Sequence, residues 1–517
     1  MSIKYRDLRE FVDALEAEGD LRRVAEPVSA RLEMTAVCDA VLRVGGPALL
    51  FERPAGYKIP VLANLFGTTR RVALAMGAGA PAALRDIGVL LANLKEPEPP
   101  KGVRDAGRLL QMAKTVWTMR PVVASRPVCR EVLIDGADVD LGLLPVQLCW
   151  PEDAGPLITW GLVITRGPQG LPTSRKRQNL GIYRQQVIGP RQVVMRWLAH
   201  RGGALDFAEF AAARPGQPFP MAVALGADPA TLLGAVTPVP DTLSEYQFAG
   251  LLRGSRTEVC DCSVGDEGEM LQAPATAEFV LEGHIPTATP GFTGTSAAGV
   301  PIKEIGGYLY ALEGPFGDHT GYYSLADDYP VLKVTAITHR RNAIYPCTIV
   351  GPPPMEDRYI GLATERLFLP LARLFVPEMI DYHLPAEGAF HNLALVRIKK
   401  RYPGHAFKVM HALWGLGQMM FTKCIVVVDE DVDVQNPGEV VWRALANIDP
   451  ERDITFVKGP IDVLDHASPL PAFGSKMGVD ATRKWPDEGF TREWPDVLKM
   501  PAEIKAKVDT LWKDLGL

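Results

Sequence analysis

The sequence Asn179-Leu-Gly-Ile-Tyr-Arg184 lies inside a long stretch, residues 154–205, that contains no aspartate and no glutamate. The basic residues of this stretch are Arg166, Arg175, Lys176, Arg177, Arg184, Arg191, Arg196 and Arg201. Because the whole chain carries a net charge of −6, such a stretch predicts a local binding site for an anion. The alternative is a solvated basic face whose acidic partners lie elsewhere in the fold.

Short apolar runs separated by glycine and proline surround this stretch from Val128 onward. They predict strands of an antiparallel sheet or barrel at residues 159–165, 219–225, 231–239 and 277–281. Between them, residues 192–200 place Val193, Val194, Trp197 and Leu198 at helical spacing, which predicts a short helix.

On both sides of the predicted barrel the pattern alternates between helices and strands. Leu8, Phe11, Val12 and Leu15 predict an amphipathic helix, and residues 32–44 predict a second helix before a buried strand at 48–51. Towards the other end, residues 425–428 predict a strand, and residues 438–448 and 501–515 predict helices. The sequence therefore predicts α/β segments before and after the barrel.

Length and composition narrow the class of protein. At about 150 residues per domain, 517 residues predict about three domains. The mildly acidic total argues against a general nucleic-acid binder, and seven scattered cysteines are typical of reduced thiols, not of a secreted disulfide framework. The chain shows no signal-peptide pattern and no run of the ~18 apolar residues that a membrane span needs. We expect a soluble cytoplasmic protein, and an enzyme in preference to a scaffold.

Several familiar metal-binding and catalytic motifs are incomplete or missing in this sequence. The acidic run at residues 429–433 lacks the glycine and glutamate of an EF-hand loop, because those positions hold Val434 and Val440. Cys260-x-Cys262 has no second pair at zinc spacing, and Gly294-x-Ser296-x-Ala298 lacks the closing glycine of a nucleophile elbow. Neither a G-x-G-x-x-G turn nor a P-loop is present, so hydrolase and nicotinamide-dehydrogenase functions have no support.

Four further blocks of the sequence are as unusual as residues 179–184. They are Met195-Arg-Trp-Leu-Ala-His-Arg-Gly-Gly203, Val236-Thr-Pro-Val-Pro-Asp-Thr-Leu-Ser-Glu245, Glu313-Gly-Pro-Phe-Gly-Asp-His-Thr-Gly-Tyr-Tyr323 and Gly474-Ser-Lys-Met-Gly-Val-Asp-Ala-Thr482. In this order they resemble UbiD-type decarboxylases over nearly the whole chain. The resemblance is tightest to the bacterial 4-hydroxy-3-polyprenylbenzoate decarboxylases of ubiquinone synthesis.

The resemblance implies a multidomain fold of the α/β and α+β classes, with a central flavin-binding split β-barrel between N-terminal and C-terminal α/β domains. We expect the N-terminal domain at residues 1–125 and the barrel at 126–330, with an insertion at about 287–312. The C-terminal domain, expected at 331–495, would mediate oligomerisation, and a last helix would occupy 496–517. Homo-oligomers, among them hexamers, are the expectation for this family.

For cofactors, the resemblance implies prenylated FMN, a divalent metal such as Mn²⁺ or Mg²⁺, and often a potassium ion. Asn179 and Glu245 match the metal ligands of the family, and both offer the hard oxygen donors that such ions prefer. Positions that match the contacts of the flavin are Ile182, Tyr183, Arg184, Arg196, Trp197, Leu198, Arg201 and Gly202. His200 is left out of the metal ligands, because the ligating histidine of some members lies in a differently spaced segment.

For catalysis, Asp318 matches the proton donor of the family, and Glu313 and Arg184 complete an acid/base network. A donor must be protonated when it acts, so we expect burial and the charge of Glu313 to raise the pKa of Asp318, while Arg184 keeps one carboxylate ionised. Read from the residues alone, an arginine with two carboxylates is also compatible with an ordinary buried ion-pair network.

The function implied is non-oxidative decarboxylation of 4-hydroxy-3-polyprenylbenzoate to 2-polyprenylphenol, with a flavin prenyltransferase supplying the cofactor. The first alternative is a related enzyme acting on another aromatic, heteroaromatic or acrylic acid, and the second is a flavin reductase or a non-catalytic flavin carrier. A polyprenyl substrate implies peripheral contact with the inner face of the cell membrane. Residues 287–312 make the segment before Glu313 longer than is usual in this family. This insertion forms either a lid over the site or an excursion on the surface.

Overall fold

The computed structural model describes residues 5–96, 106–168, 178–237, 243–266 and 269–515. The N-terminal part contains a four-stranded sheet in the order β1-β2-β3-β19. Its strands are β1 (Leu21–Val24), β2 (Ala48–Phe51), β3 (Val61–Ala63) and, from much later in the chain, β19 (Tyr345–Pro346). The helices are α1 (Leu8–Ala17), α2 (Glu33–Arg43), α3 (Thr69–Ala75), α4 (Leu84–Lys95) and α5 (Ala106–Met119).

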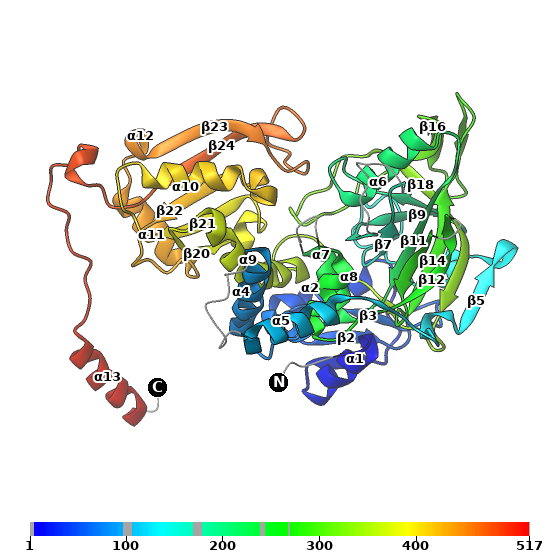
Figure 1. The fold of residues 1–517 in the computed structure, drawn as a ribbon, viewed down its shortest axis with the longest axis horizontal. Coiled ribbons are helices and arrows are strands. Elements are labelled where there is room, and N and C mark those ends of the chain that lie inside the picture. Colours follow the sequence, from blue (N-terminus) through cyan, green and yellow to red (C-terminus); the bar gives the residue numbers. More distant parts are fainter. Residues whose placement is uncertain (1–4, 97–105, 169–177, 238–242, 267–268, 516–517) are drawn as a thin grey trace.

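A twelve-stranded, curled antiparallel sheet is built mainly from the middle of the chain and lies on the right in Figure 1, which confirms the predicted barrel. Its main path is β15-β16-β17-β18-β14-β11-β7-β8, and β5, β6, β9 and β10 pair beside it. The strands are β5 (Val132–Asp135), β6 (Leu157–Ile158), β7 (Leu162–Thr165), β8 (Asn179–Ile182), β9 (Gln185–Gly189), β10 (Gln192–Met195), β11 (Phe219–Leu225), β14 (Phe279–Ile285), β15 (Thr293–Thr295), β16 (Pro301–Ile305), β17 (Tyr308–Glu313) and β18 (Asp327–His339).

Three helices and a small sheet cover this barrel. The helices are α6 (Gly202–Ala213), α7 (Pro229–Val236) and α8 (Glu245–Arg253). The small sheet has the order β13-β12-β4, from β4 (Val122–Val123), β12 (Glu258–Asp266) and β13 (Glu269–Pro274). Ser244 and Gln247 form a capping box at the start of α8, which fixes the first turn of the helix and with it Glu245.

Two local predictions are wrong. Residues 231–236 are helical, within α7, and not a strand. Asp228 caps that helix by accepting from Thr231 N, and Pro229 follows at the first helical position, a start signal that the apolar run concealed. Residues 192–195 form strand β10, and not a helix, because Val193 and Val194 pair with both β9 and β18.

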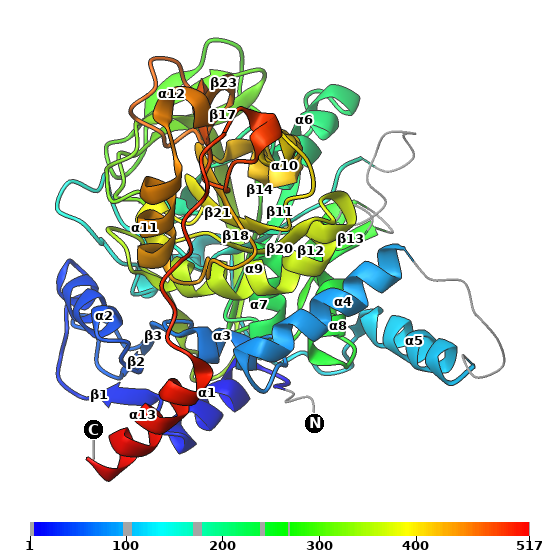
Figure 2. The same ribbon diagram turned by 90° about the vertical axis from the view of Figure 1, so that its left-hand side faces the viewer.

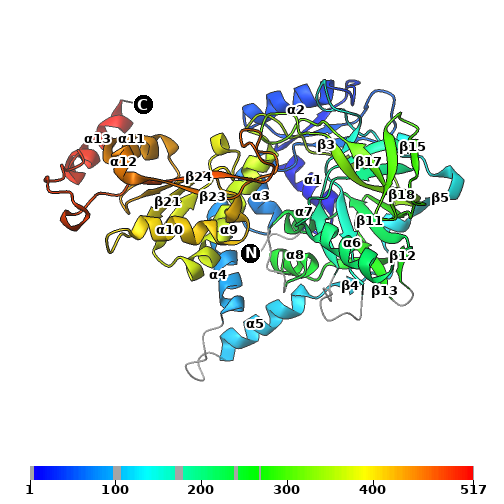
Figure 3. The same ribbon diagram turned by 90° about the horizontal axis from the view of Figure 1, so that it is seen from above.

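The C-terminal part is an α/β layer built on a five-stranded sheet in the order β20-β21-β22-β24-β23. Its strands are β20 (Met379–His383), β21 (Leu393–Ile398), β22 (Cys424–Val428), β23 (Ile454–Pro460) and β24 (Phe473–Asp480). Its helices are α9 (Glu356–Phe375), α10 (His405–Trp414), α11 (Pro437–Asn447) and α12 (Pro450–Asp453). The last helix, α13 (Ala502–Asp514), stands away from this layer at the end of an extended segment (Figure 1), and it overlaps α11 and α12 only in the view from above (Figure 3).

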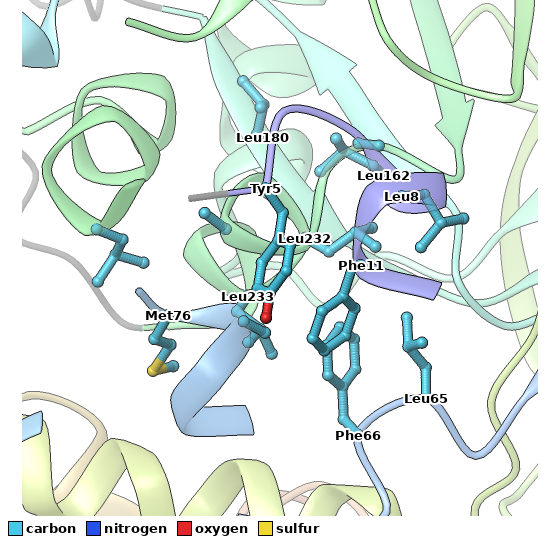
Figure 4. Packing of buried hydrophobic residues seen from close by; sticks show 14 of the residues in the cluster. Tyr5, Leu8, Phe11, Leu65, Phe66, Met76, Leu162, Leu180, Leu232 and Leu233 are labelled. Atoms are coloured by element: carbon cyan, nitrogen blue, oxygen red, sulfur yellow. The ribbon is translucent and has the colours of Figure 1, made fainter. Parts of the chain in front are cut away.

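One apolar core joins the N-terminal part to the barrel. Tyr5 and Phe11 at the start of the chain pack beside Phe66, and Leu162 and Leu232 of the barrel lie next to them (Figure 4). Helices α4 and α9 pack against each other and link the N-terminal and C-terminal parts (Figure 2). None of the helices in the described part of the chain is long and apolar enough to cross a membrane.

Candidate active site

Arg184, directly before β9, joins two carboxylates that lie far from it in sequence. Its Nε and Nη2 atoms donate to the two oxygens of Glu313 at 2.7 and 3.0 Å, and Nη1 donates to Asp318 Oδ2 at 2.6 Å. The side chain of Glu313 is fully buried, and those of Asp318 and Arg184 are 10% and 11% exposed. The fold therefore brings together the three residues that the sequence placed in one acid/base network.

The loop that carries Asp318 is fastened from several sides. Gly314 N donates to Gln186 Oε1 at 3.0 Å, and Gly317 N donates to Asp153 Oδ1 at 2.9 Å. Ser324 Oγ closes the loop, because it accepts from Phe316 N and from Arg184 Nη2. A Cβ atom at Gly317 would lie 2.2 Å from the Trp150 ring, so this position requires glycine.

The pKa of Asp318 is lowered, and the expectation of a raised pKa is wrong for this arrangement. Burial raises it, as expected, but the hydrogen bond from His319 and the positive charges of Arg184 and Arg196 outweigh burial. Arg184, which donates to Asp318 Oδ2, therefore helps to hold Asp318 as an ion.

His319 is the site residue that sequence reasoning missed. Its Nδ1 atom lies 2.9 Å from Asp318 Oδ1, and its backbone N–H donates to the same oxygen at 2.8 Å. The signal was present, since His319 stands inside the quoted block at 313–323. Adjacent side chains often point in different directions, so adjacency alone did not predict this contact.

The residues expected to contact a flavin line one region beside this network. Tyr183 and Trp197 stand edge to face with ring centres 6.3 Å apart, and Arg196 Nε lies 3.8 Å from Glu313 Oε2. Ile182 is half-buried at the end of β8. Leu198 accepts a hydrogen bond from Arg201 N, and Arg201 and Gly202 begin helix α6.

This region fits an anionic ligand that accepts hydrogen bonds. Trp197 Nε1 is buried and has no hydrogen-bond partner among the described residues. The side chain of Arg201 does not cap the start of α6, and Tyr183 Oη accepts from Gly203 N at 3.4 Å. The backbone N–H groups of this first turn and Arg201 together form a positive end. Arg175, Lys176 and Arg177 lie outside the described residues, whereas Arg166, Arg184, Arg191, Arg196 and Arg201 are described.

Glu245 contacts the backbone of the residue that follows Asn179, the other expected metal ligand. Leu180 N donates to Glu245 Oε2 at 3.4 Å, and both side chains are buried. The charge of Glu245 and a hydrogen bond from Asn179 both act on the Tyr183 hydroxyl, whose pKa is raised mainly by burial. Within the described ranges no cluster of three His, Cys, Asp or Glu residues forms a metal site, so ligand or water oxygens would have to complete this one.

His200, which was left out of the metal ligands, contacts the C-terminal part. It is exposed, and its ring lies 5.4 Å from Phe421 of the C-terminal part.

Comparison with known families agrees with this arrangement. The chain matches the N-terminal domain of 3-octaprenyl-4-hydroxybenzoate carboxy-lyase at residues 12–91, its Rift-related domain at 120–353 and its C-terminal domain at 358–481.

Solved structures cover almost all of the chain. The UbiD-class enzyme HmfF from Pelotomaculum thermopropionicum, in complex with FMN, is 30% identical with a TM-score of 0.75, over 98% of this chain and 99% of that one. Vanillic acid decarboxylase from Sedimentibacter hydroxybenzoicus, in closed form, is 28% identical with a TM-score of 0.77, over 99% of each chain. An evolved dimeric form of HmfF in complex with prFMN is 28% identical with a TM-score of 0.73, over 97% and 98%. The chain belongs to the UbiD family of carboxy-lyases.

Proposed function

We propose that this chain uses prenylated FMN to remove CO2 from an aromatic acid, and that the acid is 4-hydroxy-3-polyprenylbenzoate, converted to 2-polyprenylphenol in ubiquinone synthesis. The observation that carries the proposal is the Arg184–Glu313–Asp318 network beside Tyr183, Arg196 and Trp197. A flavin reductase or a flavin carrier would not need a buried acid/base network next to its flavin. The two HmfF structures contain FMN and prFMN, respectively. The matching family is named for a carboxy-lyase that acts on 3-octaprenyl-4-hydroxybenzoate.

The chemistry requires a cofactor. Loss of CO2 leaves an electron pair in the plane of the ring, and protein side chains offer no place to hold it. Prenylated FMN supplies an electrophilic centre for that purpose. Arg201, Gly202 and the start of α6 would hold its phosphate, and Trp197 Nε1 would donate to one of its acceptors. Asn179 and Glu245 would hold Mn²⁺ or Mg²⁺, whose positive charge would offset the negative charge of the phosphate, with a potassium ion as a further component.

The network has separate roles for its members. Asp318 would give a proton to the carbon that has lost CO2. Arg184 would orient both carboxylates, because each of its donor atoms is engaged by Glu313, Asp318 or Ser324. Glu313, which is fully buried, would keep Arg184 in place and so fix the position of Asp318.

The test is to produce the chain together with a flavin prenyltransferase, in buffer containing Mn²⁺ and K⁺, and to measure CO2 release. The acids are 4-hydroxy-3-prenylbenzoate, 4-hydroxybenzoate without the tail, and vanillic acid. We expect the prenylated acid to react with the largest kcat/KM. Preference for an acid without the tail would instead favour a related enzyme for another aromatic, heteroaromatic or acrylic acid. Loaded protein that releases no CO2 and exchanges no ring hydrogen with any acid would contradict the enzyme proposal.

A polyprenyl tail resides in membranes, so we further propose peripheral contact of the protein with the inner face of the cell membrane. Co-sedimentation with lipid vesicles that contain the polyprenyl acid, compared with vesicles without it, tests this contact. Equal recovery of the protein in the supernatant in both cases would contradict it.

A further inference from the structure

Asp318 is held between two basic groups, one on each oxygen. Arg184 donates to Oδ2 at 2.6 Å, and His319 Nδ1 lies 2.9 Å from Oδ1. Arg184 cannot be deprotonated in a protein, so it cannot supply a proton. His319 can, because imidazole changes charge near neutral pH. Any proton that Asp318 passes on can therefore be replaced across its contact with His319.

His319 also has acidic groups on its far side, from the C-terminal part of the molecule. Asp357 in the first turn of α9 and Asp462 after β23 both act on its charge, and the ring of His391 lies 5.1 Å away. Phe390 covers one face of the His319 ring at 5.2 Å. Beyond Asp318 stand the positive charges of Arg184 and Arg196.

These surroundings favour the charged imidazolium. Burial lowers the pKa of His319, but the hydrogen bond and charge of Asp318, with the charges of Asp357 and Asp462, outweigh burial and raise it above its ordinary value. His391 differs, since burial and the neighbouring His319 lower its pKa. Asp357 Oδ2 is buried and has no hydrogen-bond partner within the described ranges.

We propose that His319 is a positioning residue that reloads Asp318 with the proton delivered to the product, across the Nδ1–Oδ1 contact of 2.9 Å. The inference rests on the proposed function and adds the source of the proton. It also explains how a carboxylate that the site keeps ionised can act as a donor.

The proposed transfer moves one proton, and no electrons, from His319 to Asp318. The N–H bond at His319 Nδ1 breaks and an O–H bond forms at Asp318 Oδ1, which leaves a neutral imidazole and a carboxylic acid. The acid gives this proton to the carbon that has lost CO2, whose electron pair forms the new C–H bond, and the carboxylate is restored. The imidazole, with its side chain 18% exposed, regains a proton from water. Each turnover releases one CO2 and takes up one proton from solvent.

The first test uses the protein without cofactor, so it does not depend on turnover. The pKa of His319 is measured by NMR titration of its ring in the wild type and in Asp318→Asn. We expect a pKa above the ordinary value of about 6.5 in the wild type, and a lower pKa in the variant. The same pKa in both proteins would show that the pair is not coupled and would overturn the inference.

The second test is the pH profile of kcat for loaded His319→Asn. Asparagine can still donate to Asp318 Oδ1 but cannot carry a proton. We expect kcat to fall about 100-fold with KM unchanged, and the decline of kcat at alkaline pH to disappear. A purely structural hydrogen bond would be rescued by asparagine, so a kcat and a profile like those of the wild type would overturn the inference. His284→Asn on β14, half-buried beside Lys333, is the matched control and should leave the profile unchanged.

A third test uses a more conservative substitution, in case His319→Asn does not fold. Asp357→Asn removes one of the charges that raise the pKa of His319, so the alkaline decline of kcat should move to lower pH. An unmoved decline would overturn the inference. If the loaded wild type decarboxylates no acid, the proposed function fails, and the NMR titration still decides whether the pair is coupled.

Discussion

Glu313 is completely buried and faces two guanidinium groups, those of Arg184 and Arg196. A buried carboxylate is tolerated because Arg184 bonds both of its oxygens. The structural role of this ion pair can therefore be separated from its role in catalysis. Replacing both Arg184 and Glu313 by neutral side chains of similar size removes the two charges and keeps most of the packing.

Arg184→Gln leaves the charge of Glu313 buried beside a neutral amide. We expect the free energy of unfolding in urea to fall by about 3–5 kcal/mol, and CO2 release to be lost. The double variant Arg184→Gln/Glu313→Gln should regain much of the stability and none of the turnover. Arg191→Gln, an exposed change in the same basic stretch, should stay within about 0.5 kcal/mol. An active double variant would contradict the role of the network in catalysis.

The sequence predicted the members of this network and not its protonation. Arg184, Glu313 and Asp318 stand in long motif blocks, so a resemblance could locate them. The direction of the Asp318 pKa depends on where the His319 ring turns and on Arg184 bonding both carboxylates, and both are tertiary features. The spacing of residues along the chain determines neither the orientation of the His319 ring nor the partners of Arg184.

Helix α9 is attached to the N-terminal part through a buried carboxyl group. Glu356 Oε1 accepts from Phe66 N at 2.6 Å, and Oε2 accepts from Thr348 Oγ1 at 2.6 Å. Burial raises the pKa of Glu356 to about 7, against the lowering effects of these hydrogen bonds and of Arg71. The folded protein therefore holds this proton at a pH where the unfolded chain has released it.

This difference predicts a pH dependence of stability. Between about pH 4.5 and 7 the folded state binds more protons than the unfolded state, so the free energy of unfolding falls as pH rises. The contribution of Glu356 is up to about 3 kcal/mol over this window. In urea unfolding, Glu356→Gln should show a correspondingly smaller decline, and the exposed change Glu387→Gln should behave as the wild type. Equal declines in Glu356→Gln and wild type would contradict this assignment.

The extra segment before Glu313 is folded onto the barrel. Strands β15, β16 and β17 extend the sheet from β18, and Ala298 N donates to Ile188 O of β9. Val300 and Ile302 cover Ile188 and Val194 of the barrel. These contacts favour a surface excursion that extends the sheet, and they do not favour a lid over the site.

A shortened hairpin tests this interpretation. Ala288 N donates to Gly307 O at 2.8 Å, so residues 289–306 can be replaced by Asn-Gly without pulling the flanking strands apart. We expect turnover and substrate preference within roughly threefold of the wild type, because loop shortening costs little and β17 is kept. A large loss of turnover in a variant that is folded by circular dichroism would support the lid instead.

At the level of elements, prediction failed where burial hid the usual periodicity. In α7, residues 229–234 are all buried, so the helix has no polar face to reveal it. In β10, the apparent helical spacing joined two valines of the strand to Trp197 and Leu198, which lie beyond its end. Strands β11 and β22 and helices α1 and α11 were predicted correctly, because each carries a clear apolar run or stripe.

At the scale of the molecule, the proposed site lies where the barrel meets the C-terminal part. Phe390 and His391 contact His319, Phe421 contacts His200, and His466 lies 4.2 Å from Tyr322, ring centre to ring centre. The family resemblance predicted the barrel with its flanking parts. It did not predict this junction, because the contacting residues come from distant segments.

Apolar surface on the C-terminal part supports the proposal of a homo-oligomer, such as a hexamer. On α11, Val441, Trp442 and Leu445 are 56%, 57% and 71% exposed, and on α13, Leu511 and Trp512 are 54% and 55% exposed. Large exposed apolar residues that cluster in this way are typical of association surfaces.

We expect size-exclusion chromatography with light scattering to give a mass of several chains for the wild type. Trp442→Glu/Leu445→Glu, or deletion of residues 496–517, should lower that mass. Val44→Glu, a change at an isolated valine that is 81% exposed, should leave it unchanged. A monomeric wild type would contradict the proposal of an oligomer.

The central claim is that Asp318 delivers the proton that replaces CO2. It is tested most directly by the reaction of 4-hydroxy-3-prenylbenzoate in D2O, followed by NMR of the product, for loaded wild type and loaded Asp318→Asn. We expect one deuterium at the carbon that carried the carboxylate, and a rate lower by roughly 100- to 10,000-fold in the variant. Product formed by Asp318→Asn at the rate of the wild type would contradict it.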